Sequence, residues 1–327
     1  MKVLITGGAG FIGSTIASAC SDAGLEPVIL DDLSAGLRVF GERFRFYEGD
    51  YGDAALVRRV FTENDIDAVV HCAASIVVPE SMTDPLKYYA NNVAKVPAFL
   101  REVLAAGCRR VIFSSTASMY EPGPDLVVDE QSALRPLSPY AASKFMVERI
   151  LEDTVAASEL RVVALRYFNP IGADPKLRTG LQLPNPSHAL GKLLQARADG
   201  QPFVVTGVDW PTRDGSGLRD YIHVWDLARA HVAALQRFDE VTADSAYEVI
   251  NLGTGTGITV FELVAAFAKV TGEEMPVRTA PPRPGDVVGC RTTADKAGQV
   301  LGWSTRLTVA DGIADALAWS AKLRDLL

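Results

Sequence analysis

The stretch KVLITGGAGFIG, residues 2–13, places a short apolar run directly before glycines at positions 7, 10 and 13. An apolar helix pattern follows from Phe11 to Cys20, and a second apolar run over residues 28–30 ends at Asp31. Glycines at this spacing let the backbone turn tightly, approach a pyrophosphate and pack a helix closely against a strand. The order of strand, glycines, helix, strand and acid therefore predicts the first unit of a dinucleotide-binding Rossmann fold.

The acid at the end of the second run indicates which dinucleotide binds. Asp31 lies where a carboxylate accepts hydrogen bonds from the adenosine ribose hydroxyls. The same carboxylate repels a 2′-phosphate, and no arginine directly follows Asp31 or Asp32 to offset its charge. The sequence therefore predicts NAD, rather than NADP, as the cofactor.

Composition excludes several classes of protein. The 327 residues suit about two domains. The net charge of −8 argues against nucleic-acid binding, which needs a basic face, and no run of 18 apolar residues exists to span a membrane. The chain opens straight into its first strand, without a signal peptide. Neither the four cysteines nor the four histidines show metal-ligand spacing, so we expect free thiols, no metal site and a cytoplasmic protein.

Strand-like and helical patterns alternate along the first part of the chain. The strand-like runs lie near residues 2–6, 27–31, 44–47, 68–71, 111–115 and 162–168, and the helical stretches near 11–23, 53–63, 85–106 and 140–157. This alternation predicts parallel βαβ units with right-handed crossovers. We therefore expect an α/β protein with a Rossmann-type doubly wound parallel sheet and a ligand at the carboxyl ends of its strands.

The amino-acid composition of the sequence changes after about residue 172. Residues 172–220 are rich in Gly, Pro, Asn and Asp and contain one helical stretch, 189–198. A late apolar run over 247–252 resembles a strand returning to the first sheet, and a helical stretch follows near 258–271. We expect a smaller α/β substrate domain interleaved with the first. The expected NAD-binding domain is 1–172 with 221–253, and the expected substrate domain is 173–220 with 254–327.

A second group of residues indicates acid–base chemistry. Thr116 closes the run Ser114-Ser115-Thr116 at the end of a predicted strand, and Tyr140 and Lys144 share one face of a later helix. A free tyrosine has a pKa near 10, which is too high for a base at neutral pH. A neighbouring ammonium and a positively charged nicotinamide ring both favour the phenolate. We therefore predict that Tyr140 exchanges a proton with a substrate hydroxyl that Thr116 orients.

These motifs resemble those of the extended short-chain dehydrogenase/reductases, and within them the UDP-galactose (UDP-glucose) 4-epimerases. The resemblance runs from residue 1 to about residue 320. Its most specific segments are residues 6–13, 31–34, 49–50, 71–74, 79–81, 88–92, 114–116, 140–144, 165–172, 217–224, 251–253 and 283–286.

The resemblance implies a role for each matching residue. The catalytic residues would be Thr116, Tyr140 and Lys144. The cofactor-binding residues would be Gly7, Gly10, Phe11, Ile12, Gly13, Asp31, Asp32, Ser34, Asp50, Tyr51, Cys72, Ala73, Ala74, Asn91, Ser114, Tyr140, Lys144 and Phe168. The substrate-binding residues would be Thr116, Tyr140, Asn169, Ser187, His188, Arg219, Arg283, Asp286 and Cys290. Among these, Asp50 and Tyr51 would meet the adenine ring, while Arg219 and Arg283 would bind the UDP pyrophosphate, as paired guanidiniums do.

The implied activity is NAD-dependent 4-epimerisation of a UDP-hexose through a transient 4-keto sugar. Cys290 would lie beside the substituent on the sugar C2 atom, where a small residue implies that N-acetylated UDP-hexoses are accepted as well. The resemblance also implies a homodimer formed through the helices near 85–106 and 140–157.

The same fold also supports other activities. A sugar-nucleotide 4,6-dehydratase or a UDP-glucuronate decarboxylase needs further acid–base groups just after Thr116, and residues 117–120 hold no acid. A UDP-glucuronate 4-epimerase stays open. A non-enzymatic NAD-sensing protein is the remote alternative, since fold alone does not decide function, and the retention of Thr116, Tyr140 and Lys144 together favours an enzyme.

Three residues depart from the family pattern. Ile76 stands where a lysine is common, Glu121 where a glycine is usual, and Pro97 lies inside the long helix expected near 85–106. We expect Pro97 to kink that helix.

Overall fold

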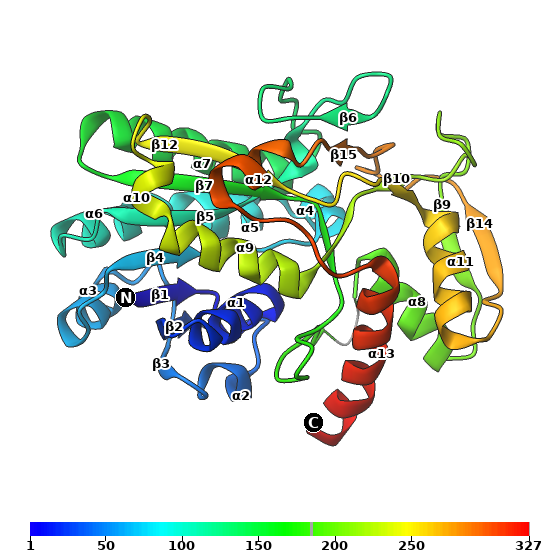
Figure 1. Ribbon diagram of the computed structural model, residues 1–327, viewed down its shortest axis with the longest axis horizontal. Coiled ribbons are helices and arrows are strands. Elements are labelled where there is room, and N and C mark those ends of the chain that lie inside the picture. Colours follow the sequence, from blue (N-terminus) through cyan, green and yellow to red (C-terminus); the bar gives the residue numbers. More distant parts are fainter. Residues whose placement is uncertain (184–185, 327) are drawn as a thin grey trace.

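A seven-stranded parallel sheet forms the centre of the protein, of which the computed structural model describes residues 1–183 and 186–326 (Figure 1). Its strand order is β12-β7-β5-β4-β1-β2-β3. The strands are β1 (Lys2–Thr6), β2 (Glu26–Asp31), β3 (Arg45–Glu48), β4 (Ala68–His71), β5 (Arg110–Thr116), β7 (Arg161–Tyr167) and β12 (Tyr247–Leu252). Each of them was predicted to within one residue at either end, and the predicted α/β doubly wound fold is confirmed.

The strand order reverses beside β1, and this places the ligand site. The chain runs outward from β1 through β2 to β3, and then returns to build β4, β5, β7 and β12 on the other side. β1 and β4 are paired, with Thr6 opposite His71. The chain after β1 leads to β2 and the chain after β4 leads to β5 on the other side, so these two segments diverge. In open parallel sheets a crevice for ligands forms at such a switch point, at the carboxyl ends of the strands.

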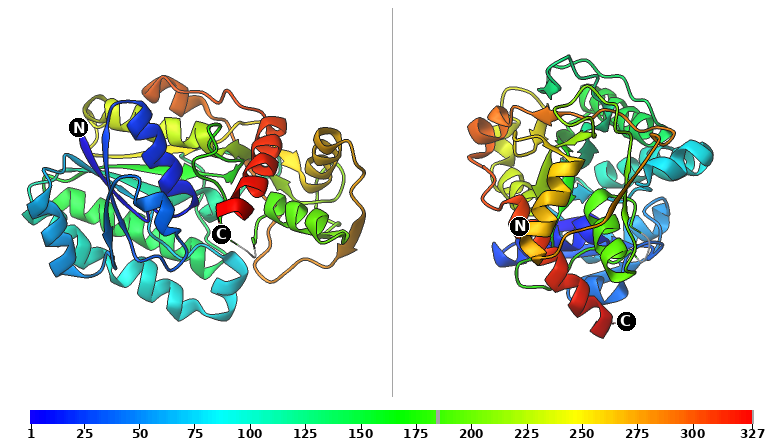
Figure 2. Two further views of the ribbon diagram at one scale, coloured as in Figure 1. Left: turned by 90° about the horizontal axis from the view of Figure 1, so that it is seen from below. Right: turned by 90° about the vertical axis from the view of Figure 1, so that its right-hand side faces the viewer.

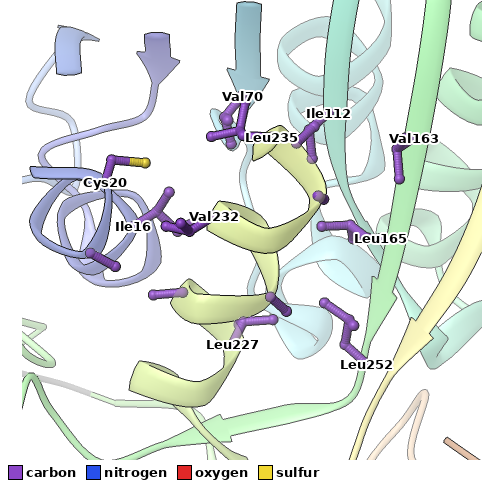
Figure 3. Packing of buried hydrophobic residues seen from close by; sticks show 14 of the residues in the cluster. Ile16, Cys20, Val70, Ile112, Val163, Leu165, Leu227, Val232, Leu235 and Leu252 are labelled. Atoms are coloured by element: carbon purple, nitrogen blue, oxygen red, sulfur yellow. The ribbon is translucent and has the colours of Figure 1, made fainter. Parts of the chain in front are cut away.

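Helices cover both faces of the sheet. α1 (Phe11–Asp22) and α9 (Val224–Gln236) cover one face, while α3 (Ala54–Glu63), α6 (Val96–Ala105) and α7 (Pro139–Ala157) cover the other. Figure 3 shows the first face, where Leu235 of α9 lies beside Val70 and Ile112 of the sheet. In the same view, Ile16 of α1 lies beside Val232 of α9. The sequence did not predict α9, because buried polar residues such as Asp226 and His231 interrupt its apolar pattern.

The helical stretch expected near 85–106 is confirmed, but a π-helical turn divides it into three parts. α5 (Pro85–Tyr89) leads into a π-helical turn, η1 (Ala90–Ala94), and α6 then begins at Val96. Pro97 therefore lies in the first turn of a new helix, where its missing N–H removes no hydrogen bond. Pro97 starts a helix rather than kinking a continuous one.

The second part of the chain forms its own core beyond the carboxyl ends of the strands (Figure 1). It contains α8 (Ala189–Ala198), α11 (Val260–Thr271), α13 (Val309–Leu326) and the pair of β9 (Phe203–Thr206) with β14 (Val277–Ala280). In the left view of Figure 2, the red helix α13 lies between the sheet part and the helices α8 and α11.

The remaining elements are short. They are α2 (Arg38–Gly41), α4 (Val78–Thr83), η2 (Ala117–Met119), β6 (Val127–Val128), β8 (Asn169–Ile171), β10 (Leu218–Arg219), β11 (Tyr221–His223), α10 (Phe238–Val241), β13 (Ile258–Thr259), β15 (Arg291–Thr292) and α12 (Asp295–Leu301). α12 and the following Trp303 pack into the core of the sheet, although the expected substrate domain includes them. The domain limits stay a prediction. In the described part of the chain, every helix falls short of the length and apolarity needed to cross a membrane.

Candidate active site

The glycine loop after β1 has the shape that a pyrophosphate needs. Gly10 is the N-cap residue of α1 and has no side chain to bond the first-turn N–H groups, so they face the loop. A Cβ atom at Gly13 would collide with the Gly7 carbonyl, and one at Gly7 would lie 2.7 Å from the Ala73 nitrogen. At Gly10, by contrast, the nearest atom would be the Gly7 oxygen at 3.4 Å. The loop therefore leaves a clear backbone surface at a helix N-terminus, which suits an anion.

Asp31 joins this loop to the turn after β2. Its Oδ2 atom accepts a hydrogen bond from the Ala9 nitrogen at 2.9 Å, and its Oδ1 atom accepts one from the Leu33 nitrogen at 2.8 Å. Burial raises the pKa of Asp31. Next to it, Ser34 Oγ donates to Asp32 Oδ1 at 2.5 Å. Each Asp31 oxygen keeps a second lone pair, so these residues fit the ribose hydroxyls of a dinucleotide.

The predicted adenine end contains a lysine that sequence reasoning missed. Lys95 Nζ donates to Asp50 Oδ2 at 2.6 Å and to Asn91 Oδ1 at 2.7 Å. Its spacing of four residues from Asn91 was the available signal. The Tyr51 ring is buried and lies edge-on against His71, so only the backbone of Tyr51 is available to line an adenine.

The three predicted catalytic residues meet at the end of β5. Ser138 caps α7 through a hydrogen bond from the Ala141 nitrogen at 3.2 Å, so Tyr140 lies in the first turn. Lys144 follows one turn later, and its Nζ donates to the Ser114 carbonyl at 2.8 Å. Thr116 ends the strand. Helix α7 thus brings a phenol and an ammonium to the strand end that carries the Thr116 hydroxyl.

Burial has the largest effect on the pKa values of Tyr140 and Lys144. It raises the pKa of Tyr140, and a hydrogen bond with Thr116 opposes the rise. It also lowers the pKa of Lys144 to about 8. The sequence argument expected Lys144 to lower the pKa of Tyr140, but in the protein chain alone burial of the phenol has the larger effect. The remaining part of that argument, the positive nicotinamide ring, comes only with the cofactor.

Other predicted cofactor residues surround Lys144. Cys72, at the end of β4, lies 3.0 Å from Ser114 through its Sγ and the serine Oγ. The Ser114 side chain is fully buried and also lies 3.3 Å from His231 Nε2. Ala73 contacts the glycine loop from the other side, as the position of Gly7 shows. Ser114 therefore offers its backbone, rather than its hydroxyl, to the open side of the site.

The two predicted phosphate-binding arginines have different surroundings. The Arg219 guanidinium donates to the carbonyls of Leu218 at 2.7 Å and Val288 at 3.0 Å, which fixes its direction. Arg283 is about half exposed and pairs with Asp286, with Nη2 2.9 Å from Oδ1. Asp286 therefore holds one edge of the Arg283 guanidinium, through Nε and Nη2.

The turn that carries Arg283 lies over the sheet part of the molecule. Gly285 has a φ of +84°, and a Cβ there would lie 3.1 Å from Met82 of α4. Five residues after Gly285, Cys290 packs against a hydrophobic cluster that contains Ala117 and Phe168, beside the end of β5. The structure thus brings residues 168 and 290 together next to Thr116.

The remaining predicted substrate residues lie at element boundaries. Asn169 begins β8, where its backbone nitrogen donates to the Asp220 carbonyl at 3.0 Å. His188 caps α8 by accepting a hydrogen bond from the Gly191 nitrogen at 3.2 Å, with Ser187 before it. His188 thus has a structural role in the protein as described. Sequence reasoning also missed Glu148 and Arg166, two buried charged residues behind the site.

Comparison with known proteins decides the family. The model of the NAD dependent epimerase/dehydratase family matches residues 3–253. The chain belongs to this family. A UDP-glucose 4-epimerase of Azospirillum brasilense is 43% identical over 98% of this chain and 92% of its own length. One from Bacillus subtilis is 40% identical over 98% and 97%. The resemblance stated from the sequence, and the prediction of NAD as cofactor, are confirmed.

Solved structures agree with this assignment. UDP-glucose 4-epimerase from Bifidobacterium longum, in complex with NAD+ and UDP, is 35% identical with a TM-score of 0.92, covering 98% of each chain. The enzyme from Stenotrophomonas maltophila, with bound NAD and formylated UDP-arabinopyranose, is 36% identical with a TM-score of 0.94 over the whole of both chains. The UDP-Glc/GlcNAc 4-epimerase of Campylobacter jejuni is 36% identical with a TM-score of 0.83, covering 98% of this chain and 99% of its own.

Proposed function

We propose that this protein interconverts UDP-glucose and UDP-galactose by NAD-dependent epimerisation at the sugar C4 atom. The observation that carries the proposal is the meeting of Thr116, Tyr140 and Lys144 at the end of β5, beside the glycine loop. The 43% identity to a UDP-glucose 4-epimerase over nearly the whole chain supports the choice of reaction.

Each residue of the site has a chemical task in this reaction. Tyr140 takes the proton of the C4 hydroxyl and later returns it, while Thr116 orients the same oxygen. Lys144 stabilises the phenolate with its ammonium. Bound NAD supplies the reversible hydride chemistry at C4. Arg219 and Arg283 hold the diphosphate. The 4-keto sugar can therefore rotate and present its other face to the cofactor without leaving the protein.

We also propose that N-acetylated UDP-hexoses are substrates. Cys290 packs beside Phe168 and Ala117 near the reacting end of the site, and a thiol leaves more room there than a phenol ring. An acetamido group needs that volume, because close-packed walls do not yield it cheaply.

One set of assays tests both proposals. Purified protein is offered UDP-galactose, UDP-GalNAc and UDP-glucuronate in parallel, and the products are separated by chromatography. We expect turnover of the first two, and Cys290→Tyr is expected to suppress only the N-acetyl reaction. Turnover of UDP-galactose without UDP-GalNAc would contradict the role of Cys290. Turnover of UDP-glucuronate alone would contradict the proposed substrate.

We further propose a cytoplasmic homodimer. The exposed apolar side chains of Leu86 on α5 and of Phe145 and Met146 on α7 lie on helices that pack together, and such side chains are typical of an interface. All four cysteines carry free thiols, which suits a reducing compartment. Phe145→Asp is expected to shift the mass measured by light scattering to that of a monomer. An unchanged mass would refute this interface.

A further inference from the structure

A buried ion pair lies directly behind the catalytic residues. Glu148 is on α7, one turn after Lys144, and Arg166 is on β7; their side chains are only 5% and 6% exposed. Arg166 Nε donates to Glu148 Oε1 at 2.9 Å, and Arg166 Nη2 donates to Oε2 at 2.5 Å. Burying two charges is costly even when they pair, so a buried ion pair is weak evidence for a stabilising role. Its contacts indicate another role.

The pair is bonded to both ends of the segment that carries Thr116. Ser115, the residue before Thr116, donates its hydroxyl to Glu148 Oε1. On the other side, Arg166 Nη1 donates to the Tyr120 hydroxyl at 2.9 Å, just after the turn η2. The Tyr120 hydroxyl in turn donates to Asn251 Oδ1 of β12 at 2.7 Å. The turn between Thr116 and Tyr120 is therefore held at its two ends by one buried network.

The same network fixes α7 on β5. Lys144 Nζ bonds the Ser114 carbonyl, and Glu148 bonds the hydroxyl of the next residue, Ser115. Two successive turns of the helix are thus attached to two successive residues of the strand. These bonds fix the rotation of α7 about its axis and its position along that axis. They therefore fix the position of Tyr140, one turn before Lys144.

We propose that Glu148 and Arg166 are positioning residues, which lock α7 to the end of β5 and so keep Thr116, Tyr140 and Lys144 in their reactive arrangement. This inference rests on the proposed function. Misplacing a reacting group by about 1 Å can cost about 10²-fold in rate, so a loosened network has a measurable effect on kcat.

Glu148 also contributes charge to the site. The titratable groups that face the Lys144 ammonium are His71 at the end of β4, Cys72 directly after it, and Glu148 from α7 itself. Burial lowers the pKa of Lys144, and the negative charge of the Glu148 carboxylate opposes that fall. Loss of the Glu148 charge therefore favours deprotonation of Lys144 and is expected to move the alkaline limb of the pH–rate profile to lower pH.

The test variant is Glu148→Gln, which keeps the size of the side chain and removes its charge. The matched control is Glu248→Gln on β12, where the lost partner is Lys296 at 2.7 Å and no catalytic residue is involved. For each protein we measure bound NAD per chain, UDP affinity, thermal unfolding, and kcat and KM against pH. We expect Glu148→Gln to lower kcat by about 10²-fold with KM, NAD content and UDP affinity retained. Glu248→Gln is expected to keep the wild-type kcat.

The single variant leaves Arg166 as an unpaired buried charge, which is destabilising by itself, so a second variant separates positioning from folding. Glu148→Gln/Arg166→Gln removes both charges and is expected to fold with NAD bound, yet to keep the loss of kcat. Arg166→Lys retains the positive charge but loses the bidentate geometry of the guanidinium. Its kcat is expected to lie between those of the wild type and the double variant. A folded double variant with wild-type kcat would overturn the positioning role alone. Wild-type protein that turns over no UDP-hexose would overturn the proposed function as well.

Discussion

Replacing Lys144 by Met is expected to stabilise the cofactor-free protein while abolishing its activity. Burial lowers the pKa of Lys144 from 10.5 to about 8. Each pKa unit corresponds to about 1.4 kcal/mol, so keeping this ammonium charged in the folded protein costs about 3 kcal/mol at neutral pH. Loss of the 2.8 Å hydrogen bond to the Ser114 carbonyl offsets about 1 kcal/mol of that gain. We expect Lys144→Met to raise the free energy of unfolding by about 2 kcal/mol.

The sign of the pH dependence follows from proton uptake. Between about pH 8 and pH 10.5 the unfolded chain binds more protons at Lys144 than the folded chain, so the wild-type protein gains stability as the pH rises. Lys144→Met lacks this gain, and its advantage is expected to shrink across the same window.

Urea unfolding of cofactor-free wild-type and variant protein, from about pH 7 to about pH 10, measures this difference. Lys192→Met is the control, because Lys192 is exposed and its removal takes no charge out of the interior. Its stability difference from the wild type is expected to stay constant over the window. If Lys144→Met were destabilised equally at both ends of the window, the argument from burial would be refuted.

Four further substitutions separate the parts of the site. Tyr140→Phe is expected to retain NAD and UDP and to lower turnover by about 10²–10⁴-fold, and near-normal turnover in a chromatographic assay would exclude Tyr140 as the acid–base group. Gly13→Ala places a Cβ against the Gly7 carbonyl and is expected to lower the unfolding free energy by about 1–3 kcal/mol, measured in urea. Gly10→Ala places its Cβ no closer than 3.4 Å to the Gly7 oxygen, an ordinary contact, so calorimetry is expected to show nearly unchanged stability with NAD affinity reduced at least about tenfold. Arg283→Ala is expected to weaken UDP and UDP-sugars alike in titration calorimetry, and a change in sugar preference without loss of UDP affinity would contradict its assignment to the diphosphate.

Much of the fold could be predicted because its signals are local. The inner strands of the central sheet, such as β1 and β4, are short apolar runs, and parallel strands buried on both faces have this pattern whatever their neighbours are. The glycine loop with Asp31, and the four-residue spacing of Tyr140 and Lys144, are local in the same sense. Chemistry that depends on one turn or one helix face could be predicted from such spacings.

The sequence by itself therefore determined the α/β class, the order of the strands along the chain, the preference for NAD and the pairing of Tyr140 with Lys144. The tertiary structure alone decided that Glu148 meets Arg166 across α7 and β7, and that Cys290 packs beside Phe168. It also decided that Lys95 reaches Asp50, and that burial rather than Lys144 governs the pKa of Tyr140. The physical reason is that hydrogen bonding and burial between residues far apart in the chain depend on packing, and the periodicity of a single segment carries no record of its partners.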